Sequence, residues 1–361
     1  MKGAAPLLVA EGRTGFIPHV HPAVWGGLAG VLAAAFVLEI SLGSVLMPVK
    51  TVAAILFGAE DVPAGLRQIV LLFRLPRAVT AMLAGSALSV SGLKMQTLFR
   101  NPLADPFVLG ISAGASLGVA LVVMAAGGLG ASVLLGKGGA AGSLSLILSA
   151  TLGAAVVLIL ILGIAGKVES NLTLLIIGLM FGYISASLVQ VLMQFSYEHQ
   201  MQSYMSWTFG SFGSVSWGQM RTFAPVVGAG LALAWILAKP LNAFLLGEGY
   251  AQSMGVDVRR ARFWIVFGSS LLAGTVTAYC GPIGFLGIAV PHLSRLLLKT
   301  SDHRVLVPAV ILVGATLALV ADLISQVPGT KIVLPLNAVT ALIGAPVVVG
   351  MILRRRHVME S

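Results

Sequence analysis

The stretch S-L-S-L-I-L-S-A-T-L-G-A-A-V-V-L-I-L-I-L-G-I-A at residues 143–165 contains no charged side chain. A helix over this range is long enough to cross the hydrocarbon core of a bilayer, which is about 30 Å thick. Because lipid cannot hydrogen-bond an open backbone, such a run predicts a membrane-spanning α-helix.

Similar runs recur on both sides of this stretch. Hydrophobic residues make up 58% of the 361-residue chain and charged residues only 9%, which is too little charge to cover a water-facing surface. We therefore expect an all-α integral membrane protein, a bundle of about ten transmembrane helices, with residues 1–22 as an N-terminal tail and residues 23–361 as one domain. The further runs are 23–47, 79–98, 107–126, 172–195, 222–237, 263–280, 283–298, 305–325 and 334–353.

Charge predicts the orientation. With both termini on the cytoplasmic side, about two thirds of the loop lysines and arginines fall on the inner face, as the positive-inside tendency requires. The basic residues are scattered over short loops, so the net charge of +10 does not indicate nucleic-acid binding. The single cysteine, Cys280, excludes an internal disulfide and is typical of a buried core residue.

Glycines at a spacing of four residues predict close helix packing. Gly110, Gly114 and Gly118 share one helix face, which allows a neighbouring backbone to approach closely. Gly26 and Gly30 repeat this spacing in the first run, so we expect tight packing there as well.

Several longer motifs follow one another in a fixed order. In the first half they are R-L-P-R at 74–77, A-G-S-A-L-S-V-S-G at 84–92 and N-P-L-A-D-P at 101–106. In the second half, G-P-I-G-F-L-G at 281–287 and P-H-L-S-R at 291–295 continue the series. Over about residues 25–353, this order resembles the FecCD-type permease family of ABC importers for ferric siderophores, haem and vitamin B12.

The resemblance implies a type II ABC importer permease fold and a set of partners. A second permease subunit, most simply an identical copy, would complete a central pathway in the lipid of the bacterial inner membrane. Two ATP-binding subunits would dock on the inner face, and a periplasmic substrate-binding protein on the outer face. The cargo implied is an iron chelate (ferric siderophore or haem) or cobalamin, moved inward by alternating access, with no cofactor.

The chain itself carries no phosphate-binding loop. That loop needs G-x-x-x-x-G-K-[ST], and the two Gly-Lys pairs, at Gly136-Lys137 and Gly166-Lys167, are not followed by Ser or Thr. We therefore expect a permease and not an enzyme, with the ATPase activity on a partner subunit.

Arg74 and Arg77 lie at the predicted outer end, against the inside bias of positive charge. The resemblance implies that they dock glutamates of the binding protein, and a guanidinium can grip a carboxylate by two hydrogen bonds. Anchoring of the helix in lipid headgroups is the alternative. The position of a third family arginine is Gln326 here, and whether Gln326 or nearby Lys331 replaces it stays open.

The resemblance also implies gate residues at the inner end. Pro102 and Pro106 predict an irregular turn in N-P-L-A-D-P, and the alternative to a gate is an ordinary turn in which Asp105 caps the next helix. The gate candidates are Asn101 and Leu103 in this turn, and Asn171 and Leu172 at the start of a later span.

A polar segment at about 244–262 resembles the coupling helices that contact the ATPase. Gly249 and Gly255 are expected to bound a short helix within it. The alternative is a solvated loop whose arginines only satisfy the inside bias. The coupling candidates are Leu246, Gly247, Glu248, Ala251, Met254 and Gly255.

Other classes of site and function find less support. His292 and Arg295 invite a metal interpretation, but no second His or Cys stands at ligand spacing, so no metal site is expected. The main alternative function is an ion-coupled secondary transporter. Such transporters place ionisable groups near the bilayer midplane, whereas Glu39, Lys94 and Asp322 fall nearer the ends of their spans.

Overall fold

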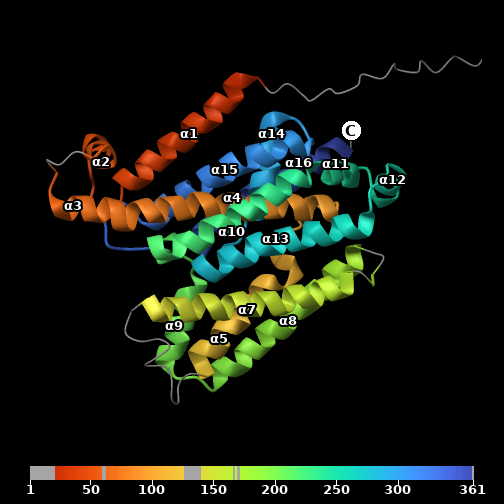
Figure 1. Cartoon of the computed structure of the whole chain (residues 1–361), viewed down its shortest axis with the longest axis horizontal. Coiled ribbons are helices and arrows are strands. Elements are labelled where there is room, and N and C mark those ends of the chain that lie inside the picture. The colour runs from red at the N-terminus through yellow and green to blue at the C-terminus, as the bar shows by residue number, and fades with distance from the viewer. Residues whose placement is uncertain (1–20, 59–61, 126–139, 166, 169–170, 360–361) are drawn as a thin grey trace, which may run out of the picture.

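The computed structural model describes residues 21–58, 62–125, 140–165, 167–168 and 171–359, and within them the chain is helical with no strand (Figure 1). This confirms the all-α prediction. The helices are α1 (Pro22–Ser41), α2 (Val49–Leu56), α3 (Ala64–Gln68), η1 (Ile69–Arg74), α4 (Leu75–Leu98), η2 (Pro106–Leu109), α5 (Ile111–Ala125), α7 (Ala140–Ala165), α8 (Asn171–Gln194), α9 (Glu198–Thr208), η4 (Phe212–Ser214), α10 (Trp217–Ile236), α11 (Ala238–Leu245), α12 (Glu248–Ser253), α13 (Val258–Cys280), α14 (Leu286–Leu298), α15 (His303–Ser325) and α16 (Leu336–Met359).

Each of the ten predicted spans corresponds to an apolar helix. In the described part of the chain, six helices are long and apolar enough to cross a membrane, and α10 with α11 forms a further, bent candidate with a 53° angle. Three shorter apolar helices, in α5, α14 and α16, account for the remaining runs.

Several predicted boundaries differ from the structure by a few residues, and two of the differences have a clear local cause. The first helix ends at Ser41 and not at Met47, because the chain turns into an extended conformation at Leu42. The second helical segment starts before Val79, at Ala64, and runs through the π-helical turn η1 into α4. Pro76 lacks the N–H that a regular α-helix would use here, and a π turn beside it accommodates the missing bond.

Helix α4 forms the centre of the bundle. It packs against α10, α13, α14 and α15, and all of its residues from Ala84 to Leu98 are buried. Figure 1 shows α5, α7 and α8 as a layer on one side of this centre, with α14, α15 and α16 on the other. Helix α1 leans across α15 and buries only residues of its last two turns.

Glycine contacts explain the close packing. A Cβ atom at Gly118 of α5 would lie 2.1 Å from the carbonyl oxygen of Ser149 in α7, and one at Gly92 of α4 would lie 1.9 Å from that of Gly287 in α14. Close packing is therefore confirmed at Gly110, Gly114 and Gly118, but the shared helix face only at Gly114 and Gly118, which pack on α7. Gly110 precedes α5 with φ +74° and packs on α8. At Gly26 and Gly30 the added Cβ would meet nothing within 4 Å, so the expectation of tight packing is wrong there within this chain.

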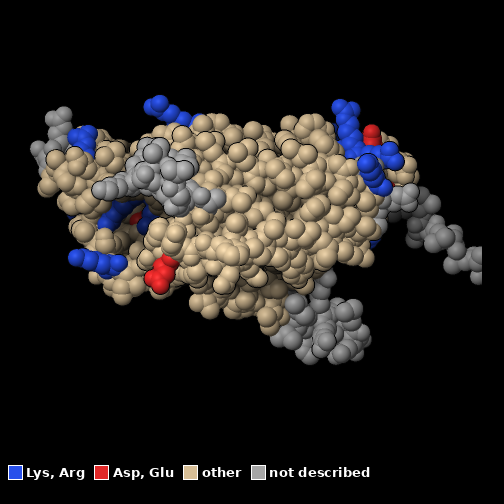
Figure 2. Space-filling model, turned by 90° about the horizontal axis from the view of Figure 1, so that it is seen from below, with Lys and Arg blue, Asp and Glu red and all other residues tan. Residues whose placement is uncertain are grey.

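Charged side chains collect at the two ends of the molecule. On the face in Figure 2, basic and acidic groups lie near both ends, with a broad uncharged band between them. The helices run between these ends in Figure 1, with α2 and α3 at one end and α12 at the other. The uncharged band fits the hydrocarbon core of a bilayer, and the α3 and α12 ends correspond to the predicted outer and inner faces.

Candidate functional site

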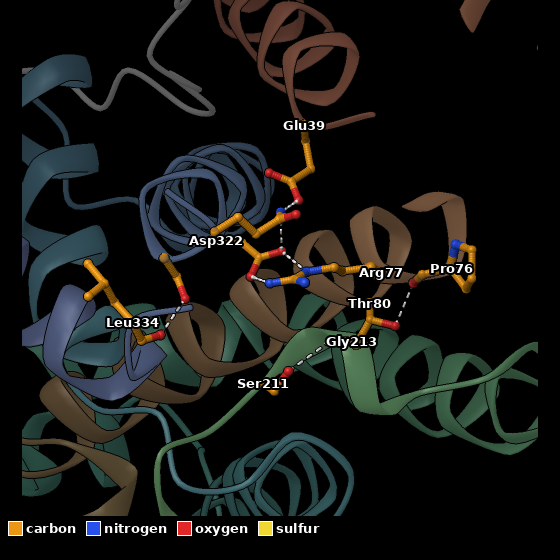
Figure 3. Close-up of polar contacts among 10 residues, drawn as sticks. Glu39, Pro76, Arg77, Thr80, Ser211, Gly213, Asp322 and Leu334 are labelled. Carbon is orange, nitrogen blue, oxygen red and sulfur yellow. Dashed lines mark hydrogen bonds and ion pairs between the residues drawn. The ribbon is translucent and has the colours of Figure 1, made fainter. Parts of the chain in front are cut away.

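Arg77 and Asp322 form a two-point ion pair at the α3 end. The Arg77 Nε donates to Asp322 Oδ2 at 2.7 Å and Nη2 donates to Oδ1 at 2.8 Å (Figure 3). The two side chains are 19% and 1% exposed. The pair joins the first turn of α4 to the last turn of α15, two segments far apart in the sequence.

Glu39 and Gln326 extend this pair toward α1. The Gln326 amide donates to Glu39 Oε1 and lies 3.5 Å from Asp322 Oδ2, so it stands between the two carboxylates. Glu39 is buried, and among the described residues its Oε2 has no hydrogen-bond partner. Gln326, which stands at the position of the family's third arginine, therefore binds side chains of its own protein chain.

Arg74 binds the backbone at the end of α1. Its Nη1 donates to the carbonyl oxygens of Ile40 at 2.7 Å and Ser41 at 3.2 Å, and its Nη2 donates to that of Val45. The last carbonyl groups of a helix lack partners within the helix, and a guanidinium supplies both hydrogen bonds and a favourable charge there. We call Glu39, Arg74, Arg77, Asp322 and Gln326 the outer polar cluster.

A cavity of about 450 Å³ opens beside the outer polar cluster. Arg74 and Arg77 line it together with Gln326, Phe73 and the segment around Gly213. Both predicted docking arginines thus bind groups of their own chain and also face a space that a partner's side chain can enter. Lys331, the other candidate for the missing arginine, lies on the exposed surface.

The predicted gate turn at the α12 end is irregular, as the prolines indicate. Asn101 and Leu103 are exposed, and the Asn101 Oδ1 accepts the Leu103 N–H at 2.9 Å. Asp105 caps the turn η2, since its Oδ1 accepts the Phe107 N–H at 2.9 Å. Burial raises the pKa of Asp105 to about 6, although this hydrogen bond opposes the shift.

The second pair of gate candidates begins α8. The Asn171 amide donates to the Leu98 carbonyl oxygen at 2.9 Å and to Glu248 Oε1 at 2.8 Å. Leu172 is exposed. The structure therefore brings a predicted gate residue into contact with a predicted coupling residue, a link that the sequence reading missed.

The polar segment forms the short helix α12, but one of its predicted boundaries is wrong. Gly249 lies inside the helix, and Gly247 precedes it with φ +109°, a conformation that favours glycine. Gly255 ends the helix as predicted, with φ +81° and a hydrogen bond from the Val256 N–H to the Ala251 carbonyl at 3.0 Å.

Some of the coupling candidates are exposed, and others are buried or hydrogen-bonded within the chain. Ala251 is fully buried, whereas Leu246 and Met254 are 62% and 60% exposed. Tyr250, which the sequence reading missed, is 53% exposed. Tyr250 lies in α12, four residues before Met254 at the C-cap of that helix, so these two side chains lie near each other. Leu246 caps α11, on the other side of Gly247.

Glu248 is held by its own chain. Its two carboxylate oxygens accept from Arg262 Nη2 at 3.0 and 2.9 Å, and Arg262 Nη1 donates to the Val168 carbonyl at 2.7 Å. The Arg262 and Glu248 side chains are 7% and 29% exposed. We call Asn171, Glu248 and Arg262 the inner clamp.

Further polar contacts fix α4 to its neighbours at the same end. Arg295 Nη1 donates to Gln96 Oε1 at 2.6 Å. His303 begins α15 and is fully buried, with Thr97 and Asn242 each 2.8 Å from one ring nitrogen.

Comparison with known proteins connects this arrangement to a transport family. Residues 31–355 match the model of the FecCD transport family. The vitamin B12 import system permease protein BtuC of Klebsiella pneumoniae subsp. pneumoniae is 38% identical over 285 residues, 78% of this chain and 82% of that protein. Its counterpart from Salmonella paratyphi A is 37% identical over 283 residues, with the same coverage of both chains. An inward-facing structure of a transporter assigned to the metal-chelate ABC type superposes with a TM-score of 0.79 at 28% identity, covering 92% of this chain and all of the other.

Proposed function

This chain belongs to the FecCD transport family, and we propose that it is the permease subunit of a binding-protein-dependent ABC importer for cobalamin or an iron chelate. The observation that carries the proposal is the likeness to vitamin B12 permeases over 78% of this chain. The helical bundle with charge at its two ends supports it, because a pathway subunit must cross the bilayer many times.

The proposed assembly has two copies of this chain, two ATP-binding subunits and one substrate-binding protein in the bacterial inner membrane. The ATP-binding subunits contact the α12 end, where Leu246, Tyr250 and Met254 offer apolar side chains that are exposed in the single chain. Both chain termini are cytoplasmic in this orientation, which the excess of inner basic residues supports.

The substrate-binding protein docks at the α3 end. Carboxylates on its surface enter the cavity beside Arg74 and Arg77 and bind their guanidinium groups. At the inner end, Asn101 and Leu103, with Asn171 and Leu172, narrow the pathway until the ATP-binding subunits move the coupling segment. The pathway opens to one face of the membrane at a time.

Uptake measurements test this function. We expect the chain, reconstituted with its ATP-binding subunits and binding protein, to import labelled cobalamin, ferric siderophore or haem only when ATP is supplied. The binding protein should select among these three, because it delivers the substrate. Failure of all three substrates in a complex that hydrolyses ATP would contradict the proposed cargo class, while failure to assemble with an ATP-binding subunit would contradict the importer itself.

A further inference from the structure

The inner clamp joins side chains of three helices, α8, α12 and α13. Glu248 lies at the first position of α12, Arg262 in the second turn of α13 and Asn171 at the start of α8. Through Asn171 the clamp also reaches the Leu98 carbonyl at the end of α4. The gate turn with Asn101 and Leu103 follows directly after this point.

Helix α12 cannot hold its own position. It has six residues, well below the length at which an isolated helix is stable in water. The flexible glycines Gly247 and Gly255 flank it. Its firm attachments are the buried Ala251 and the Glu248 carboxylate, which receives three hydrogen bonds from Arg262 and Asn171.

The hydrogen bonds of the clamp favour an internal role for Glu248 over a direct contact with another subunit. Arg262 is only 7% exposed, so a partner has little access to it, and the Glu248 oxygens are already shared by two donors. Hydrogen bonds to charged groups are the strong class, so this link is stiffer than the apolar contacts around it.

We propose that the inner clamp transmits the movement of α12 to the cytoplasmic gate. When an ATP-binding subunit binds the exposed Leu246, Tyr250 and Met254 and shifts α12, Glu248 pulls Arg262 and Asn171 with it. Asn171 then displaces the start of α8, where Leu172 lies, and the end of α4, which the gate turn with Asn101 and Leu103 follows. Glu248 is therefore a positioning residue and not an ATPase contact. This inference rests on the proposed function and names how that function is coupled.

Substitutions in the assembled transporter test the proposal. Glu248→Gln removes the ion pair with little change in shape, and Arg262→Gln removes it with a shorter neutral side chain. We expect both to keep the ATP-binding subunits bound and the basal ATPase active, and to lower the amount of cobalamin or ferric siderophore imported per ATP hydrolysed by about tenfold. The double variant should be no worse than either single variant, because the two residues act as one unit. The control is Asp257→Asn in the same segment, an exposed cap that keeps its acceptor for the Arg260 N–H and should leave this ratio unchanged.

A reporter measurement covers the case in which transport is too weak to measure. Cys280→Ala first removes the only native cysteine. A spin label is then attached to a cysteine introduced by Gln252→Cys on α12 or by Leu103→Cys in the gate turn. ATP should change both signals in the otherwise unaltered complex. With Glu248→Gln, the signal at Gln252 should still change and that at Leu103 should not.

The outcomes separate the two proposals. Loss of the ATP-binding subunits in Glu248→Gln, together with normal coupling in Arg262→Gln, would identify Glu248 as a direct contact and overturn the clamp. An unchanged import ratio in both variants would also overturn it while leaving the importer function intact. A native complex that neither hydrolyses ATP nor imports any of the three substrates contradicts the proposed function instead.

Discussion

The outer polar cluster and the inner clamp use the same chemistry in different surroundings. In the outer cluster, Arg77 and Asp322 close on each other within the bundle, beside the buried Glu39. In the inner clamp, Glu248 holds a short surface helix on which Tyr250 is exposed, with Met254 exposed at its end. At both ends, charged side chains that the sequence analysis predicts to contact partner proteins bind groups of their own chain instead. The two ends differ in the surface that is left for a partner, which is a cavity lined by arginines at the outer end and apolar side chains at the inner end.

This difference suggests two kinds of contact. At the outer end a partner's carboxylate must share arginines that already have acceptors, which favours a reversible, salt-sensitive contact. At the inner end we expect the partner to contact apolar side chains. The charged residues of the inner clamp would then transmit movement without contacting the partner. If the proposed function holds, we expect a reversible contact with the binding protein at the outer face and a contact that transmits movement at the inner face.

The largest expected effect separates docking from stability at the outer end. Arg77→Glu alone places a carboxylate against Asp322 and should abolish stimulation of the ATPase by the binding protein. Arg77→Glu with Asp322→Arg restores an ion pair of reversed polarity, so the complex should stay folded yet remain unstimulated. The measurement is ATP hydrolysis with and without the binding protein. Recovery of stimulation in the reversed pair would show that Arg77 serves the fold alone.

The exposed apolar side chains at the α12 end predict the next effect. Replacing Leu246, Tyr250 and Met254 together with serine should weaken binding of the ATP-binding subunits by at least about a hundredfold, since each buried apolar side chain contributes about 1.5–3 kcal/mol. The thermal stability of the isolated permease should change little, because these side chains are exposed in it. Co-purification and a melting curve check both statements, and the exposed Gln252→Ala on α12 serves as the control. Undiminished co-purification would remove these side chains from the interface.

Breaking the outer ion pair should cost stability. Asp322→Ala leaves the Arg77 charge largely buried without its carboxylate, and breaking a buried pair costs about 3–5 kcal/mol, with the lower value expected here because Arg77 is partly exposed. Denaturation in detergent measures the loss. Arg77→Gln with Asp322→Asn should recover most of it, because an amide pair leaves no unpaired charge. An Asp322→Ala protein as stable as the native one would mean that the pair contributes nothing to the fold.

Asp105 predicts the smallest effect, a dependence of stability on pH. Its pKa rises from 3.8 to about 6 in the folded protein, so the folded state favours the protonated form. Protonated Asp105 therefore contributes to folding stability, fully below about pH 4, and this stability is lost as the pH rises to about 6. Asp105→Asn keeps the acceptor for the Phe107 N–H and should be more stable than the native protein above pH 6, by at most about 3 kcal/mol. Unfolding at several pH values checks this, and an advantage that persists unchanged at pH 4 would contradict it.

The sequence predicted the local features and missed the long-range ones. Apolar runs gave the ten spans, and the spacing of Gly110, Gly114 and Gly118 gave close packing. The link between Asn171 and Glu248 crosses 77 positions and that between Arg77 and Asp322 crosses 245, and no periodicity reports such pairs. The prediction that Gly249 bounds α12 is wrong because glycine occurs both inside and at the ends of so short a helix. The positive φ angle of Gly247 identifies the start of the helix, and the sequence does not report that angle.

The most direct test of the central claim is uptake by vesicles that contain this chain alone or in its full complex. We predict that labelled cobalamin or a ferric siderophore accumulates only with the ATP-binding subunits, the binding protein and ATP, and that vanadate stops it. Accumulation by the chain alone, driven by a proton or sodium gradient, would contradict the account and identify a secondary transporter.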